Sequence, residues 1–293
     1  MRRISISRFG AAIGFSTLAF LGFGLPAGRA SSQETLSAAD PAALPGILKA
    51  AGDYCEIVKG MALNFVCLER IREQENFFTR GTGSSRNSPD AIKRAKSKTR
   101  TFAYDYQIIK SKDDVQEKRT QLEEDGRRRR VENAELPTLK FSGRNLVYGP
   151  VGFLSRYWQG FFLYEIVGRE EVAGRKAIVV RAAPKTAREE NNNRGRVWVD
   201  ASSHQILRLE LEPPNTGPTD VVFGNDSAAV GANFRRQLTW TIDYGIEKKG
   251  VLFPSRQTIR ETYVSDTGYK IVKREVVFDY TDYRYFTVEV EIK

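Results

Sequence analysis

Residues Leu238 to Ile246 read L-T-W-T-I-D-Y-G-I, and this stretch sets the expectation for the fold. Apolar side chains occupy every second position, and polar or small residues stand between them. Because successive side chains of a β-strand point to opposite faces, a strand with this pattern buries one face and wets the other. Half-buried strands are typical of antiparallel sheets, since parallel strands are usually covered on both faces.

The same alternation recurs in residues 102–108, 207–211 and 286–292. Turn-forming residues separate the alternating segments at Asp125-Gly126, Ala173-Gly174 and Asp266-Thr267-Gly268. The pattern predicts about a dozen antiparallel strands, most of them joined as hairpins. Longer segments rich in Gly, Ser, Asn and Pro are expected to be loops, and they cover residues 81–97, 184–194 and 213–233.

Helical spacing appears near the N-terminus. The apolar stripe there predicts a helix from about Leu44 to Lys59, which Gly60 would stop. A second, short helix is expected after Pro150. We therefore expect a mainly β (α+β) fold, in which a curled antiparallel sheet forms an unclosed β-barrel and both helices cover its concave face. No repeat or linker divides the chain, so residues 44–293 are expected to form a single domain.

The segment Val151 to Gly168 is unusually rich in aromatic residues. Its first half has the spacing of one helix face, made by Phe153, Leu154, Tyr157, Trp158 and Phe161. Gly160 interrupts this pattern, and Phe162, Tyr164 and Ile166 then alternate as a strand. The five residues of the helix face are our candidate ligand-binding residues, as the lining or the lid of an apolar cavity. The alternative is that they are ordinary core.

The first 30 residues have the pattern of a secretory signal peptide: a basic start, an apolar run at Ala11 to Gly24, and small residues Gly28 and Ala30 at the −3 and −1 positions. Residues 31–43 are expected to be flexible. Because residues 1–30 hold four Arg and no acid, their removal lowers the formal charge from +10 to +6. No cysteine lies near the cleavage site, so we expect an exported, periplasmic chain without a lipid anchor or another membrane span.

Two cysteines in an exported chain favour a disulfide. Cys55 lies on the predicted helix and Cys67 on the strand that follows it. If the helix folds back on that strand, the two sulfur atoms meet, and the bridge contributes roughly 3 kcal/mol to stability. The alternative is two separate buried thiols.

Few residues offer catalytic chemistry. The single histidine, His204, lies in a predicted turn, where a solvated imidazole is the expected state. Carboxylates such as Glu123 and Glu124 adjoin the basic run Arg127 to Arg130, and opposite charges are expected to pair across this hairpin. The sequence predicts no enzyme, no catalytic residue, no cofactor and no metal site. A nucleic-acid partner is not expected of an exported protein.

Gly195 to Leu211 reads G-R-V-W-V-D-A-S-S-H-Q-I-L-R-L-E-L and follows the hairpin between Tyr164 and Lys185. These hairpins resemble the LolA/LolB/RseB-like superfamily of bacterial exported proteins, in which a strand ending in W-x-D precedes a turn and another strand. The resemblance implies an unclosed β-barrel whose apolar cavity takes acyl chains or lipidated protein. A regulatory module of RseB type, with an envelope protein as its partner, is the alternative that the resemblance offers.

Overall fold

The structure is a computed structural model, and it describes residues 41–80, 92–111, 114–136, 153–186, 194–212 and 234–285. These residues belong to one compact unit, Leu36–Lys293. The predicted signal peptide and the predicted strand at residues 286–292 lie outside the described residues. So does most of the segment expected to be flexible, whose last residues, Pro41–Ala43, form a 3-10 turn.

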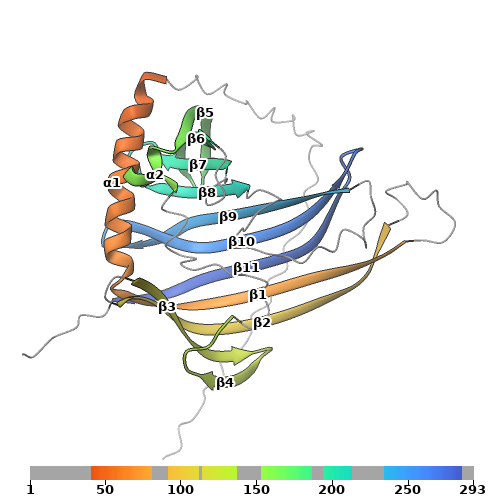
Figure 1. Ribbon diagram of the computed structural model, residues 1–293. Helices are drawn as coiled ribbons and strands as arrows, with labels where there is room; N and C mark the ends of the chain where they lie inside the picture. The colour runs from red at the N-terminus through yellow and green to blue at the C-terminus, as the bar shows by residue number, and fades with distance from the viewer. Residues whose placement is uncertain are drawn as a thin grey trace, which may run out of the picture. The chain divides into compact units, whose positions relative to one another are not determined.

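The described strands form one antiparallel sheet that is not closed into a barrel, as predicted (Figure 1). Its strand order is β4-β3-β2-β1-β11-β10-β9-β8-β7-β6-β5. The eleven strands are β1 (Phe65–Arg80), β2 (Ile92–Ser111), β3 (Asp114–Glu124), β4 (Arg127–Val131), β5 (Phe162–Val172), β6 (Arg175–Pro184), β7 (Arg194–Asp200), β8 (Ile206–Glu212), β9 (Phe234–Lys248), β10 (Val251–Ser265) and β11 (Lys270–Tyr285).

Neighbouring strands are also consecutive in the chain at every position of this order except one. The exception is β1, which pairs with β11 at the centre of the sheet, where Ile71 lies opposite Phe278. The first and last described strands therefore join the two halves of the sheet. β4 and β5 are left as its ends.

The predicted turns have the backbone that tight hairpins require. Asp125 and Gly126 both have positive φ, at 48° and 77°, and Ala173 and Gly174 have φ of 50° and 79°. Two consecutive positive φ values match the right-handed twist of the flanking strands. One predicted loop is too long, because β2 already begins at Ile92 and pairs there with Arg80 of β1.

Helix α1 (Leu44–Ala62) packs on one face of the sheet, which we call the inner face. Its buried stripe has the predicted spacing and consists of Ile47, Ala51, Tyr54, Cys55, Val58 and Ala62. The helix ends later than predicted, because it continues through Gly60. A glycine inside a helix costs only about 1 kcal/mol relative to alanine, and the burial of Ala62 in the next turn helps to offset that cost.

The predicted disulfide between Cys55 and Cys67 is wrong. Both cysteines are buried, and they are not joined. Figure 1 shows the reason, because α1 crosses the strands steeply instead of folding back along β1. Cys55 lies eight residues before Leu63, about 12 Å along the helix axis, while Cys67 is the third residue of β1 and lies about 7 Å along that strand in another direction. A disulfide requires Cα atoms within about 7 Å.

The inner face of the sheet carries most of the core. Its largest fully buried side chains are aromatic, and they include Phe65, Tyr104, Tyr106, Phe253, Phe278 and Tyr280. Beneath α1, the rings of Phe65, Phe253 and Tyr283 meet with centroids 4.8 to 5.5 Å apart. The Tyr54 hydroxyl of α1 donates to the carbonyl of Leu252, which fixes the point where the helix crosses β10.

Candidate functional site

The predicted helix of the aromatic segment is a single turn, α2 (Arg156–Gln159), and two of the five candidate residues come before it. Phe153 and Leu154 are buried. The Phe153 ring meets the Phe162 ring edge-on, with centroids 4.7 Å apart. Its carbonyl accepts a hydrogen bond of 2.9 Å from the Tyr164 hydroxyl. These two candidates therefore fasten the segment to the core.

The other three candidates form an aromatic cluster, which we define as Tyr157, Trp158 and Phe161. Each ring contacts the other two, with centroids 5.1 to 5.6 Å apart. Tyr157 is 69% exposed, whereas Trp158 and Phe161 are partly buried against the core. The sequence placed all five candidates on one face, but the structure divides them between the interior and the surface.

Helix α2 is held tightly against α1. Gln159 Nε2 donates hydrogen bonds of 2.7 Å to the carbonyls of Leu48 and Leu154. Gly52 of α1 makes this close approach feasible, since a Cβ at that position would lie 2.9 Å from Gln159 Nε2. Arg156 donates to the Asp53 carboxylate from Nε at 3.0 Å, and the pKa of Asp53 is lowered mainly by this contact.

The inner face carries a buried ionic network that the sequence analysis missed. Arg119 donates to both oxygens of Glu69, at 2.7 and 3.1 Å, and to Glu117 at 3.1 Å. The Tyr106 hydroxyl also donates to Glu117, at 2.8 Å. Burial alone would lower the pKa of Arg119, but the Glu69 carboxylate outweighs it and keeps the guanidinium ionised. A local signal existed, since Glu69 shares the odd-numbered parity of the buried residues Phe65, Cys67 and Ile71.

Polar side chains continue across the same face. The Trp240 indole donates to Gln257 at 2.9 Å, and the Gln257 amide donates to the Tyr280 hydroxyl at 2.6 Å. Tyr280 lies opposite Glu69, and Glu69 lies opposite Tyr104. Among the described residues, the buried Tyr104 hydroxyl has no hydrogen-bond partner. The interior therefore offers polar groups as well as apolar surface.

An apolar stripe runs along the inner face beyond the reach of α1. Ile71, Ile259, Val276 and Phe278 are buried neighbours on three adjacent strands. Ile259 lies seven residues from Leu252, where α1 crosses β10, which corresponds to roughly 20 Å along the strand. A helix with its side chains reaches only about 5 to 6 Å from its axis. Neither described helix therefore accounts for the burial of this stripe.

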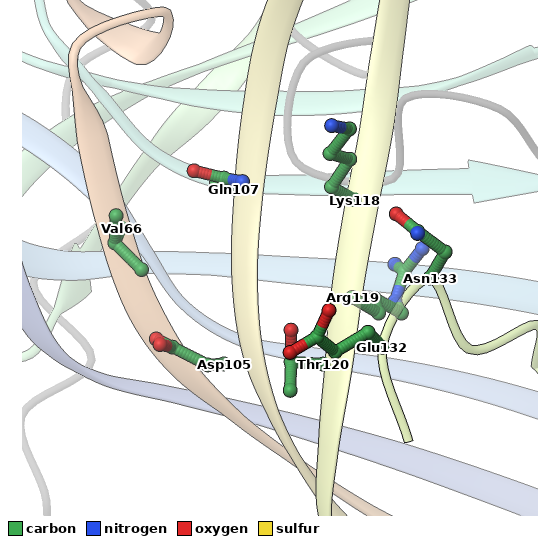
Figure 2. A pocket seen from close by; sticks show the side chains of 8 residues that line it. All are labelled: Val66, Asp105, Gln107, Lys118, Arg119, Thr120, Glu132 and Asn133. Carbon is green, nitrogen blue, oxygen red and sulfur yellow. The ribbon is translucent and has the colours of Figure 1, made fainter. Parts of the chain in front are cut away.

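Charged side chains line two open pockets among the described residues. The first, of about 280 Å³, has seven polar lining residues and one apolar one, Val66; they come from β1, β2, β3 and the segment after β4 (Figure 2). The second has a volume of about 240 Å³. Its lining consists of Arg181, Arg194, Arg196, Glu210 and Glu212, together with the small residues Ala182, Ala183 and Gly195. Both linings carry charges of both signs, which do not suit an acyl chain.

The W-x-D motif has a structural role. Asp200 accepts hydrogen bonds from the backbone of Ser202 and Ser203, and from the Ser202 hydroxyl, at 2.6 to 2.9 Å. Arg175 also donates to it, at 2.7 Å. Trp198 lies under the Arg196 guanidinium and donates to Glu170 at 2.8 Å. The motif therefore fixes the turn between β7 and β8.

The charged groups noted in the sequence form no reactive centre among the described residues. Glu124 pairs with Arg100 at 3.2 Å and with Arg129, across the β3–β4 hairpin. His204 lies in the β7–β8 turn with φ of 58°. Within the described ranges, no group of His, Cys, Asp and Glu could hold a metal ion. No helix there is long and apolar enough to cross a membrane.

No protein-family model and no curated protein matches this chain. Its structure is similar to a domain from Vibrio parahaemolyticus described as an outer membrane lipoprotein-sorting protein domain, with 11% identity over 83% of this chain and 94% of that chain, and a TM-score of 0.40. A LolA superfamily protein from Nitrosomonas europaea is 12% identical over 83% and 94% of the chains, with a TM-score of 0.34. The MucA/MucB complex of Pseudomonas aeruginosa is 13% identical over 79% and 94%, with a TM-score of 0.23.

Proposed function

We propose that this protein is an exported binding or carrier protein whose apolar interior accepts an acyl chain, either free or attached to a lipidated protein. The stripe of Ile71, Ile259, Val276 and Phe278 carries the proposal, because Ile259 lies roughly 20 Å along β10 from the point where α1 crosses that strand. The signal-peptide pattern of residues 1–30 supports export to the periplasm.

The five candidate residues have separate roles in this proposal. Phe153 and Leu154 line the closed end of the interior and hold the segment in place. Tyr157, Trp158 and Phe161 form the lid at that end, because they cap the junction of α2 with β5. Movement of α2 away from Gly52 would then open the interior. The bonds that it must break are those of Gln159 and Arg156.

Binding of a fluorescent fatty acid tests the proposal. Residues 31–293, which contain the whole compact unit, should bind the probe and release it to unlabelled fatty acid. Trp158→Asp should weaken binding by at least roughly tenfold, because a charge in the lid opposes the burial of an acyl chain. Leu122→Asp is the matched control, since Leu122 is an exposed apolar residue on β3. Circular dichroism must show that both variants are folded. Equal binding by the two variants would contradict the assignment of the lid.

The alternative is an envelope regulatory or interaction module with a protein partner and no cargo. The exposure of Tyr157 favours it, because a surface aromatic can anchor a partner, and so does the dense filling of the inner face by tyrosine and phenylalanine. This reading predicts that the chain binds no fatty-acid probe and captures a single envelope protein. Probe binding by the purified chain distinguishes the two functions.

A further inference from the structure

The aromatic cluster is part of a larger exposed surface. Leu163 directly follows the buried Phe162, so the two side chains lie on opposite faces of β5. Leu163 is 61% exposed, and only Tyr157 among the described large apolar side chains is more exposed. Because β5 is an end strand of the sheet, no further described strand lies beside it. We call Tyr157, Trp158, Phe161 and Leu163 the aromatic edge.

Cationic side chains surround the aromatic edge. Arg156 and Lys49 both pair with Asp53, and Arg181 pairs with Glu165. Lys185 donates to the Gly160 carbonyl at 2.9 Å, at the base of the cluster. The nearby carboxylates are Asp53, Glu165 and Glu56, the last of which also acts on Arg156, so the four cations outnumber them and the surroundings of the edge are positive. All four side chains are exposed, and their long stems allow the charges to extend beyond the rings.

We propose that the aromatic edge docks the protein on the surface of an anionic lipid bilayer. Tyr and Trp favour the boundary between headgroups and acyl chains, because each has an apolar body and a polar tip. An exposed leucine beside them adds burial in the outer acyl region, and the surrounding cations are attracted to anionic headgroups. A surface of a few side chains gives weak, reversible attachment. The edge thereby places α2 and its junction with β5 against the lipid.

Vesicle co-sedimentation tests the docking. Residues 31–293 should bind vesicles of phosphatidylcholine with about one third phosphatidylglycerol, and should bind pure phosphatidylcholine much more weakly. Binding should fall as salt rises, because the headgroup attraction is screened. Leu163→Ser and Tyr157→Ser should each weaken binding by roughly tenfold, since each removes one apolar anchor. Lys49→Gln with Lys185→Gln should weaken the preference for anionic vesicles.

Tyr269→Ser provides the matched control. Tyr269 is an exposed tyrosine in the β10–β11 hairpin, at the end of β10 away from α1 (Figure 1). Thirteen residues separate Leu252 from Ser265, so this hairpin lies roughly 40 Å from the point where α1 crosses β10. The control should bind vesicles as the wild-type chain does. An equal loss with Tyr269→Ser would show that any exposed tyrosine contributes, and would overturn the proposal.

Two further outcomes contradict the docking. The first is a wild-type chain that co-sediments with neither kind of vesicle, even if it binds other proteins. The second is unchanged binding by Leu163→Ser and Tyr157→Ser. Fatty-acid uptake measured without vesicles tests the carrier function separately. Leu163→Ser should leave this uptake unchanged, because Leu163 is outside the proposed interior. A chain that takes up the probe but ignores vesicles contradicts the docking alone, and one that binds vesicles without uptake contradicts the carrier alone.

Discussion

Arg119 and Glu69 form a two-pronged ion pair, with hydrogen bonds of 2.7 and 3.1 Å, on the inner face of the sheet where both side chains are buried. Two charges taken out of water cost several kcal/mol each, and their attraction offsets that cost only while both partners remain. The pair therefore stabilises the contact between β3 and β1 only while both charged side chains are present.

Glu69→Gln should destabilise the protein by about 3 to 5 kcal/mol, because it leaves the buried Arg119 guanidinium without its main partner. Asp279→Asn is the control, since it breaks the exposed pair with Arg256 and should cost no more than about 1 kcal/mol. Urea unfolding followed by circular dichroism measures both. Equal, small losses in the two variants would show that the Glu69 site is solvated.

The inner face shows what the sequence could and could not predict. Alternation revealed the strands because one face of each is wet, and Leu238, Ile242 and Tyr244 are indeed buried. It could not reveal that β1 pairs with β11, because a partner about 200 residues away leaves no local trace. The direction of α1 across the strands is equally non-local, and the disulfide prediction failed on that point. Helical spacing indicated the helical turn of the aromatic segment but not its short length, and the ligand-binding role of its five residues stays a prediction.

Asp200→Asn should destabilise the protein at neutral pH by about 1 to 3 kcal/mol, because the carboxylate accepts four hydrogen bonds that stabilise the β7–β8 turn. Burial raises the pKa of Asp200, but these hydrogen bonds and Arg175 outweigh it, and the net shift is downward.

A lowered folded-state pKa stabilises the protein above the unfolded value of about 3.9. The contribution is lost as pH falls through the folded value. The difference in stability between wild type and Asp200→Asn should therefore be full at pH 7 and shrink below about pH 4. Urea unfolding across this range checks it. A difference that grows as pH falls would have the wrong sign.

Two glycines of α1 should respond oppositely to alanine. Gly60→Ala should stabilise the protein by about 0.5 to 1 kcal/mol, because its Cβ meets nothing within 4 Å and alanine favours a helix. Gly52→Ala should lose that gain, because its Cβ would lie 2.9 Å from Gln159 Nε2 and 3.2 Å from Arg156 Cγ. Thermal unfolding compares them. In the Gly52 variant, the intrinsic tryptophan fluorescence of the chain should also shift, because Trp158 moves with α2. Equal stabilisation by both would show that α2 does not rest on Gly52.

Cys55 and Cys67 should be reduced and unreactive in the folded protein. Burial raises the pKa of Cys55 to about 12 and that of Cys67 further still, so neither thiolate forms at neutral pH. A maleimide reagent should add nothing to the native chain and two labels to the denatured chain without reductant. If the denatured chain is labelled only after reductant is added, the two cysteines are joined in a disulfide after all.

Native mass spectrometry of residues 31–293, purified without detergent from a bacterial periplasm, tests the carrier function most directly. The account predicts a population that carries the mass of a fatty acid or lipid, which extraction with organic solvent identifies and which Trp158→Asp reduces while the fold stays intact. A single bare mass in every preparation, together with no uptake of added fatty acid, would contradict it.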